Sequence, residues 1–130
     1  MVDITRSSHQ PWRTGQARGE RYRFIDLGGT RVGARLEELP PGGTSSEHHS
    51  HSLEEEHVYL LAGDAVLVLD DEEVLLHAGD HVAFPAGEGD GHHLVNRANT
   101  ACRYLVYGMR DPNDVVTYPN RRKTVGKDSH

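Results

Sequence analysis

The stretch GTSSEHHSHSLEEEHVYLLAG, residues 43–63, contains the pair His49 and His51, separated by one residue, and places Glu56 just before an apolar run. Side chains two residues apart on an extended strand project from the same face, so these two imidazoles can bind one ion. Taken alone, histidines in such a polar run could also lie in a solvated loop.

A second stretch, GDHVAFPAGEGDGHHLVN at residues 79–96, adds a third histidine at His92. Three imidazoles and one carboxylate form a set of nitrogen and oxygen donors that suits a first-row divalent metal. The sequence therefore predicts a metal site with His49, His51, Glu56 and His92 as its ligands. Ring nitrogens that do not bind the ion usually meet an outer acceptor, for which a nearby serine hydroxyl or a backbone carbonyl is available.

The spacing of both stretches resembles the two sequence motifs of the cupin superfamily. The matching positions are Gly43, His49, His51, Glu56 and Gly63 in the first motif, and Gly79, Pro85, Gly87, His92 and Asn96 in the second. The second motif departs from the family in having four residues instead of two between its last glycine and its histidine. The resemblance covers about residues 32–108, and the runs EEEHVYLLAGD and DVVTYP are similar to a bacterial subgroup of small single-domain cupins. It implies a double-stranded β-helix, a jelly-roll barrel whose mouth holds the metal.

The motifs also choose between neighbouring donors. The six-residue gap to the turn glycine of the first motif favours Glu56 as the carboxylate ligand, with Glu55 as the alternative. The three-residue gap to Asn96 favours His92 over His93 as the third imidazole. The longer turn could shift the strand by one residue, and such a shift exchanges its two faces.

The whole chain, residues 1–130, is expected to be one all-β domain. Short apolar runs rich in valine, leucine and aromatic residues recur between Gly, Pro, Asp and Asn, a pattern typical of a sandwich or barrel. The expected strands are Arg21–Asp26, Val32–Leu39, Glu56–Leu61, Ala65–Leu69, Val74–His77, His81–Phe84, His92–Asn96 and Arg103–Tyr107. The acidic run DDEE between two of these strands is expected to be a solvated hairpin turn.

Charge and composition exclude several classes of function. The formal net charge of −6 argues against a nucleic-acid partner. The longest apolar runs are too short to span a bilayer, and the first residues lack the apolar core of a signal peptide. The single cysteine, Cys102, cannot form an internal disulfide and is expected to be a buried thiol. We therefore expect a cytoplasmic protein with no membrane partner.

Strand parity indicates what surrounds the ion. Four residues, Val58, Phe84, Leu94 and Tyr104, are expected to line a substrate pocket. The Tyr104 phenol could meet a substrate or bond to protein in the core. The run Ala65–Leu69 is apolar on both faces, so a second face must be covered. A second subunit would provide this cover in a homodimer, and N-terminal residues that fold back could do the same.

Four protein ligands on an ion that prefers six leave positions for a substrate. Iron would support oxygen chemistry, whereas manganese, nickel or zinc would act as a Lewis acid. The prediction is one divalent ion (Fe, Mn, Ni or Zn) per chain, in an enzyme of dioxygenase, isomerase or lyase type that acts on a small molecule. The alternatives are a non-catalytic cupin that binds or senses a small molecule, and a metal-free structural cupin. An acid or base beside the ligands would favour an isomerase or lyase, and the sequence identifies no unambiguous one.

Overall fold

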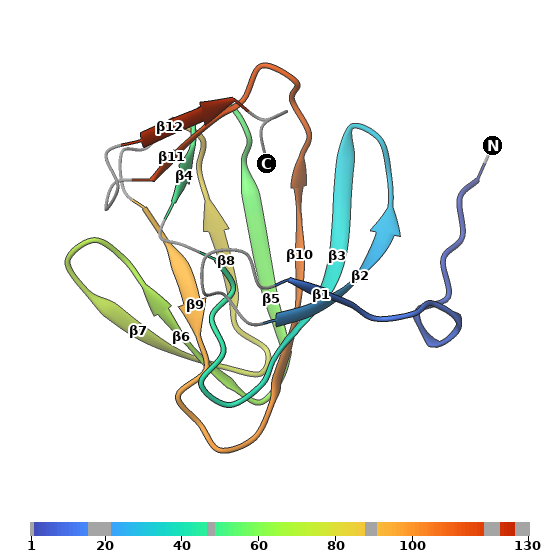
Figure 1. The fold of residues 1–130 in the computed structure, drawn as a ribbon, viewed down its shortest axis with the longest axis vertical. Helices are drawn as coiled ribbons and strands as arrows, with labels where there is room; N and C mark the ends of the chain where they lie inside the picture. Colours follow the sequence, from blue (N-terminus) through green and yellow to red (C-terminus); the bar gives the residue numbers. More distant parts are fainter. Residues whose placement is uncertain (1, 16–21, 47–48, 88–90, 119–122, 127–130) are drawn as a thin grey trace.

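The fold is all-β, as predicted, and its antiparallel sheets curve into a barrel of the jelly-roll kind (Figure 1). The computed structural model describes residues 2–15, 22–46, 49–87, 91–118 and 123–126. The described elements are η1 (Ser7–His9), β1 (Arg13–Gly15), β2 (Tyr22–Gly28), β3 (Val32–Leu39), β4 (Ser50–His51), β5 (Glu56–Ala62), β6 (Asp64–Val68), β7 (Glu73–His77), β8 (His81–Phe84), β9 (His93–Val95), β10 (Cys102–Met109), β11 (Val115–Tyr118) and β12 (Lys123–Gly126).

One wall of the barrel is a sheet in the order β1-β2-β3-β10-β5-β8. Its strand β5 alternates as the sequence predicts. Val58 and Leu60 are buried on the inner face, while Tyr59 and Leu61 are exposed on the outer face. Because Glu56 has the parity of Val58, it also belongs to the inner face.

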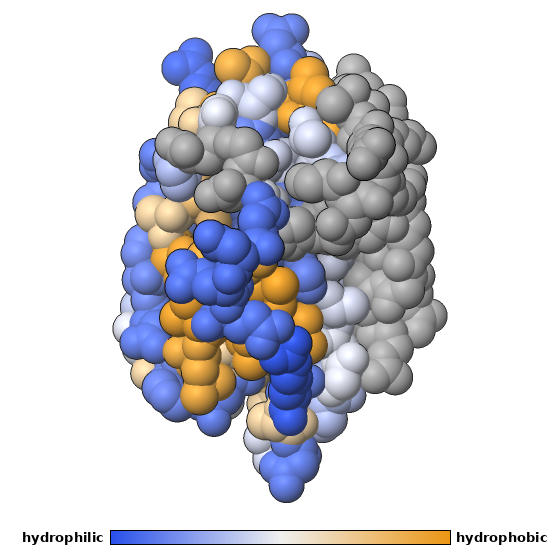
Figure 2. Space-filling model, turned by 90° about the vertical axis from the view of Figure 1, so that its left-hand side faces the viewer, coloured by the Kyte–Doolittle hydropathy of each residue, from blue (hydrophilic) through white to orange (hydrophobic). Residues whose placement is uncertain are grey.

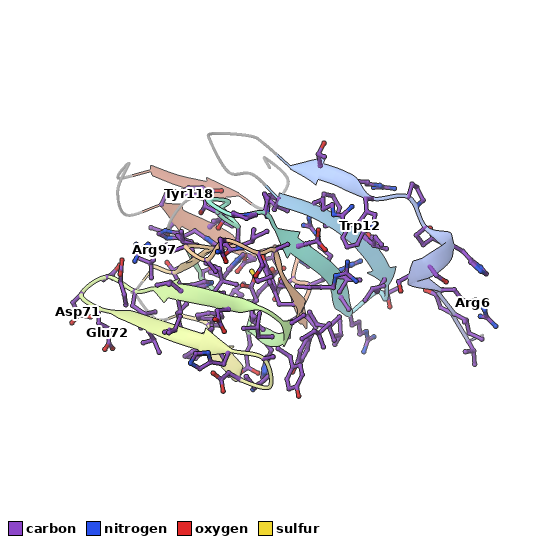
Figure 3. All side chains as sticks on the ribbon, turned by 90° about the horizontal axis from the view of Figure 1, so that it is seen from below. Arg6, Trp12, Asp71, Glu72, Arg97 and Tyr118 are labelled. Atoms are coloured by element: carbon purple, nitrogen blue, oxygen red, sulfur yellow. The ribbon has the colours of Figure 1, made fainter. Side chains whose placement is uncertain are left out.

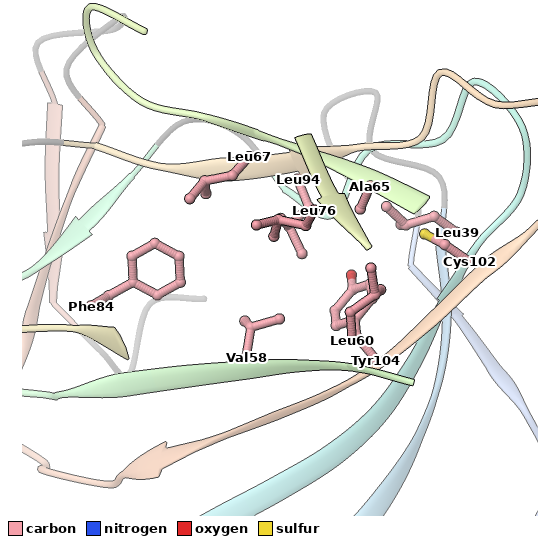
Figure 4. Close-up of a cluster of buried hydrophobic side chains, with 10 residues drawn as sticks. All are labelled: Leu39, Val58, Leu60, Ala65, Leu67, Leu76, Phe84, Leu94, Cys102 and Tyr104. Carbon is pink, nitrogen blue, oxygen red and sulfur yellow. The ribbon is translucent and has the colours of Figure 1, made fainter. Parts of the chain in front are cut away.

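The opposite wall consists of two small sheets, in the orders β7-β6-β9 and β12-β11-β4. The first of these packs its inner side chains against the large sheet to form the core (Figure 4). The members of this core are Leu39, Val58, Leu60, Ala65, Leu67, Leu76, Phe84, Leu94, Cys102 and Tyr104. Cys102 is fully buried, as expected, and this burial raises the pKa of its thiol to about 11.

The predicted strands all appear, with ends that differ by at most two residues, although Arg21 lies outside the described part of the chain. The sequence did not predict β1, β4, β11 and β12, because these are short and lie in polar or terminal segments. The turn between β5 and β6 explains the last glycine of the first motif. Gly63 has a φ of 76°, and a Cβ there would lie 2.7 Å from the carbonyl oxygen of Ala101.

The acidic run forms the tip of the β6–β7 hairpin, as expected. Asp71 and Glu72 are exposed there and point away from the barrel (Figure 3). Within the described residues, no helix has the length and apolar character needed to cross a membrane.

The outer face of the β7-β6-β9 sheet is apolar. Val66 and Val68 are half-buried, and Leu75 beside them on β7 is 56% exposed. Figure 2 looks onto the side where this hairpin lies and shows apolar side chains gathered among charged ones. The described N-terminal residues, 2–15, do not provide the cover, because β1 pairs with β2 at the far edge of the large sheet (Figure 1). The sequence left two candidates to cover this outer face, the N-terminal residues and a second subunit. We therefore propose the second subunit.

Candidate metal centre

Two stretches of the sequence, residues 49–56 and the segment at His92, meet at one end of the barrel. His49 and His92 lie opposite each other in an isolated β-bridge, and each backbone N–H donates to the other's carbonyl (3.2 and 2.8 Å). His51 follows on β4, and Glu56 begins β5 on the facing wall. The bridge and the two strands thus hold three imidazoles and one carboxylate together.

The donor atoms of His49, His51 and Glu56 lie close enough to surround one ion, and His92 adjoins this group at Glu56. Glu56 Oε1 is 3.3 Å from His92 Nε2, and Glu56 Oε2 is 3.7 Å from His51 Nε2. The His49 ring centroid lies 5.1 Å from that of His51 and 4.6 Å from that of His92. His49, His51 and Glu56 each offer one ligand atom, all within 4.8 Å of one another. Neighbouring ligands with bonds of about 2.1 Å are about 3.0–3.4 Å apart, so small adjustments would close the site.

The electrostatics of the cluster keep Glu56 ionised. Burial opposes its charge, but the hydrogen bond from His92 and the charges of the three imidazoles outweigh this effect and lower the Glu56 pKa to about 2. An ionised carboxylate is the form that binds a metal ion. The residues present therefore fit a divalent ion in both geometry and charge.

The described structure separates the competing donors. Glu55, the alternative carboxylate, lies 2.7 Å from His57 Nε2, and its side chain is half exposed. His93 has the parity of Val95, opposite to that of the core residue Leu94. The geometry therefore brings Glu56 and His92 to the cluster, which are the donors that the motif spacing favours.

The remaining histidines of the described chain do not join this cluster. His77 pairs with Asp64 on the surface (2.8 Å) and His81 is exposed, as expected. His57 is half-buried on the outer face, with its ring 5.1 Å from that of His81. His48 and His130 lie outside the described residues.

A buried carboxylate that the sequence did not reveal orients His51. Asp114 is 1% exposed, and its Oδ2 accepts a hydrogen bond from His51 Nδ1 (2.7 Å). Its Oδ1 accepts two more, from the backbone N–H groups of Leu53 and Glu54 (2.8 and 3.0 Å). A carboxylate only accepts hydrogen bonds, so Nδ1 of His51 carries a proton, and in the neutral form of the ring the lone pair on Nε2 faces Glu56.

Nearby serines do not take this role for His51. The Ser52 hydroxyl instead accepts from the Val115 backbone N–H (2.8 Å). A serine does meet His49, whose Nδ1 lies 3.1 Å from the Ser46 hydroxyl. His51, Glu54 and Asp114 also form a group that could hold a metal ion, but this group shares His51 with the main cluster.

A cavity of about 840 Å³ opens beside the cluster, which is within the usual size range of ligand pockets. The predicted pocket residues Val58, Phe84, Leu94 and Tyr104 all line it. Phe84 stacks on His92 with ring centroids 3.7 Å apart, which fixes the imidazole plane.

The sequence allowed the Tyr104 hydroxyl either to contact a substrate or to form a hydrogen bond with protein in the core. The structure shows the hydrogen bond with protein. Tyr104 is fully buried and donates a hydrogen bond to Glu37 Oε1 (2.8 Å). Asn96 likewise serves the fold, because its Nδ2 donates to the carbonyl oxygens of Leu39 and Thr100 across a turn.

Glu37 is a buried acidic residue in the cavity that the sequence did not identify. It is 7% exposed, comes from β3 on the inner face and lines the same cavity as the cluster. Burial raises its pKa, and the charge of Arg35 and the hydrogen bond from Tyr104 offset this rise only in part. A carboxyl group with a raised pKa in a cavity is suited to exchange protons.

The fold and this site define a small β-barrel protein with a histidine and glutamate cluster that could bind a metal ion. The family model described as the cupin domain matches residues 35–108, and the chain belongs to this family. A comparison with curated proteins gives no match.

Two solved structures are similar over most of the chain. The sugar phosphate isomerase of a cupin superfamily from Silicibacter pomeroyi is 29% identical, with a TM-score of 0.81 over 94% of this chain and 91% of the other. A putative sugar phosphate isomerase from Acidithiobacillus ferrooxidans is 33% identical, with a TM-score of 0.77 over 82% of this chain and 70% of the other. A predicted oxalate decarboxylase from Thermotoga maritima, 24% identical with a TM-score of 0.73 over 82% of this chain and 97% of the other, shares the fold.

Proposed function

We propose that this protein is a metal-dependent isomerase that acts on a small hydroxy-carbonyl compound such as a sugar derivative. The observation that carries the proposal is Glu37, a buried carboxyl group that lines the cavity of the metal cluster without belonging to it. An isomerase needs such a group in addition to the ligands, whereas a module that only binds its ligand does not. The names of the two most similar structures reported above agree with this chemistry.

The residues that would hold the ion are His49, His51, Glu56 and His92. A divalent ion held there would act as a Lewis acid on the carbonyl and hydroxyl oxygens of the substrate. Phe84 and the other apolar residues of the cavity wall would pack against the carbon skeleton of the substrate.

Glu37 moves the proton that isomerisation requires. It takes a proton from the hydroxyl-bearing carbon next to the carbonyl and delivers it to the former carbonyl carbon, while the hydroxyl proton passes from one oxygen to the other. The product is an isomer of the substrate, so no oxidant or other reactant is consumed. The hydrogen bond from Tyr104 holds the Glu37 carboxyl group in one orientation.

Deuterium exchange tests this proposal without knowledge of the natural substrate. Metal-loaded protein would be incubated in D₂O with a panel of free and phosphorylated aldoses and ketoses, and proton NMR would follow carbon-bound hydrogen. We expect exchange and interconversion of at least one pair, and a loss of about 100-fold or more in Glu37→Gln.

Glu38→Gln is the matched control, because Glu38 is the next residue on β3 and forms ion pairs with Arg23 and Arg103 away from the cavity. This variant should exchange at the wild-type rate. An absence of exchange with every compound, or equal rates in Glu37→Gln and the wild type, would contradict the proposal and favour a binding module.

A further inference from the structure

Arg35 lines the cavity, and two of its hydrogen-bond donors are buried and unpaired among the described residues. It comes from β3 at the register of Val106, and its guanidinium carbon lies 3.7 Å from the centroid of the Phe24 ring. Among the residues that the structure describes, neither Nε nor Nη2 of Arg35 has a hydrogen-bond partner, although both atoms are buried. Buried polar atoms are nearly always paired in native proteins, so this pair of donors indicates a ligand.

The neighbouring carboxylate does not satisfy these donors. Glu37 Oε2 lies 3.4 Å from Arg35 Nε, which is an ion pair without the geometry of a hydrogen bond. This contact leaves Nη2 unengaged. A guanidinium stays charged at any physiological pH and binds carboxylate or phosphate oxygens through two parallel N–H groups.

A second arginine at the cavity is already engaged. The Arg110 Nη1 donates to the carbonyl oxygen of Gly29 (3.0 Å), and its Nη2 lies 3.9 Å from Asp26 Oδ1. Several carboxylates also line the cavity, and the chain carries a net charge of −6. An anion entering this negative surrounding needs a specific cation, and Arg35 is the residue placed to supply it.

Arg35 and the metal cluster lie on different parts of the cavity wall. Strands β3 and β5 both flank β10, so their backbones are about 10 Å apart. Arg35 projects from the first of these strands and Glu56 from the second, both on the inner face. A small molecule of several carbons can therefore reach both with its two ends.

We propose that Arg35 binds the anionic end of the substrate, a phosphate or carboxylate group, while the other end faces the metal cluster. The inference rests on the proposed function for the reaction at that other end. Anion binding itself needs no turnover, so it can be tested separately.

Calorimetric titration with inorganic phosphate and with acetate tests the inference, on metal-loaded protein and on protein stripped with a chelator. We expect at least one of the two anions to bind the wild type in both forms, and to bind Arg35→Met at least tenfold more weakly. Arg97→Met is the matched control, because Arg97 pairs with Glu73 on the surface, and it should bind as the wild type does. Binding of phosphate alone would identify a phosphorylated substrate, and binding of acetate alone a carboxylate.

Arg35→Lys guards against a folding defect, since it keeps the charge and loses the planar pair of donors. Weakened binding in this variant, with an unchanged circular dichroism spectrum, would support the inference. Equal affinity in Arg35→Met and the wild type, or no binding of either anion, would overturn it. Wild-type binding that disappears with the metal would also overturn it, because the anion would then sit on the ion. If Glu37→Gln keeps full isomerase activity while anion binding still depends on Arg35, the proposed function fails and this inference stands.

Discussion

Replacing Asp114 with asparagine tests how the protein prepares His51 to bind a metal ion. The carboxylate of Asp114 accepts from His51 Nδ1 at 2.7 Å, which leaves the lone pair on Nε2 beside Glu56. An asparagine can keep its oxygen on the backbone N–H groups of Leu53 and Glu54, but it then turns its amide N–H₂ toward His51. The imidazole is driven to the other tautomer, in which Nε2 carries the proton and cannot bind a metal.

The expected loss of metal affinity can be estimated from the role of Asp114 in orienting His51. Loss of the group that orients a metal-binding histidine typically costs 10–100-fold in metal affinity, or about 1.4–2.7 kcal/mol. Asp114→Ala should do further damage, because it leaves the part-buried N–H groups of Leu53 and Glu54 without their acceptor. Such a loss costs about 1–3 kcal/mol of folding free energy for a buried donor, and less where water reaches the donor. Asparagine should therefore mainly weaken metal binding, and alanine should also destabilise the fold.

Competition with a chromophoric chelator would measure zinc affinity, and urea unfolding would measure stability. Asp64→Asn is the matched control, because Asp64 forms the same kind of hydrogen bond with His77 on the surface, away from the cluster. It should leave zinc affinity unchanged. Zinc affinity in Asp114→Asn equal to that of the wild type would refute the role of Asp114.

Three further predictions concern the third imidazole, the acid in the cavity and the outer face. His92→Ala should weaken metal binding by well over tenfold and His93→Ala should change it little; the reverse ranking in the same chelator assay would exchange their roles. Burial raises the Glu37 pKa above 4.5, so its ionisation destabilises the fold as the pH rises from 4.5 through the raised value. The free energy of unfolding of Glu37→Gln relative to the wild type should accordingly increase with pH, and a difference that is constant from pH 4 to 8 would contradict this. Light scattering should give twice 14.4 kDa for the wild type and a smaller mass for Leu75→Glu, whereas a clean wild-type monomer would reject the dimer.

The sequence predicted most strands because turn residues separate them and period-2 alternation marks the faces. On β5 the alternation is clear, since Val58 and Leu60 are buried and Tyr59 is exposed. On β3 it fails, because Leu36 and Leu39 are both buried although they have opposite parities. Both faces of that strand are covered, so parity could not tell which of its acidic residues points into the cavity.

The sequence could not predict which residues surround the metal-binding side chains, for a different reason. Asp114 is 63 residues from His51, and only the pairing of β11 with the two-residue strand β4 brings them together. Only the structure shows that Arg35 lines the cavity. From the sequence alone, an arginine on a strand is expected to be solvated. The DVVTYP run, which begins at Asp114, is similar to other small cupins, but the run did not indicate what the aspartate does.

Metal analysis of protein purified without chelator and without nickel resin tests the central claim most directly. The account predicts about one divalent ion per chain in the wild type, and loss of that ion in the double variant His49→Ala, His51→Ala. Acid should release the ion as the imidazoles protonate below a pKa of about 6.5. Full metal occupancy in the double variant, or a metal-free wild type that does not take up a divalent ion on titration, would contradict the account.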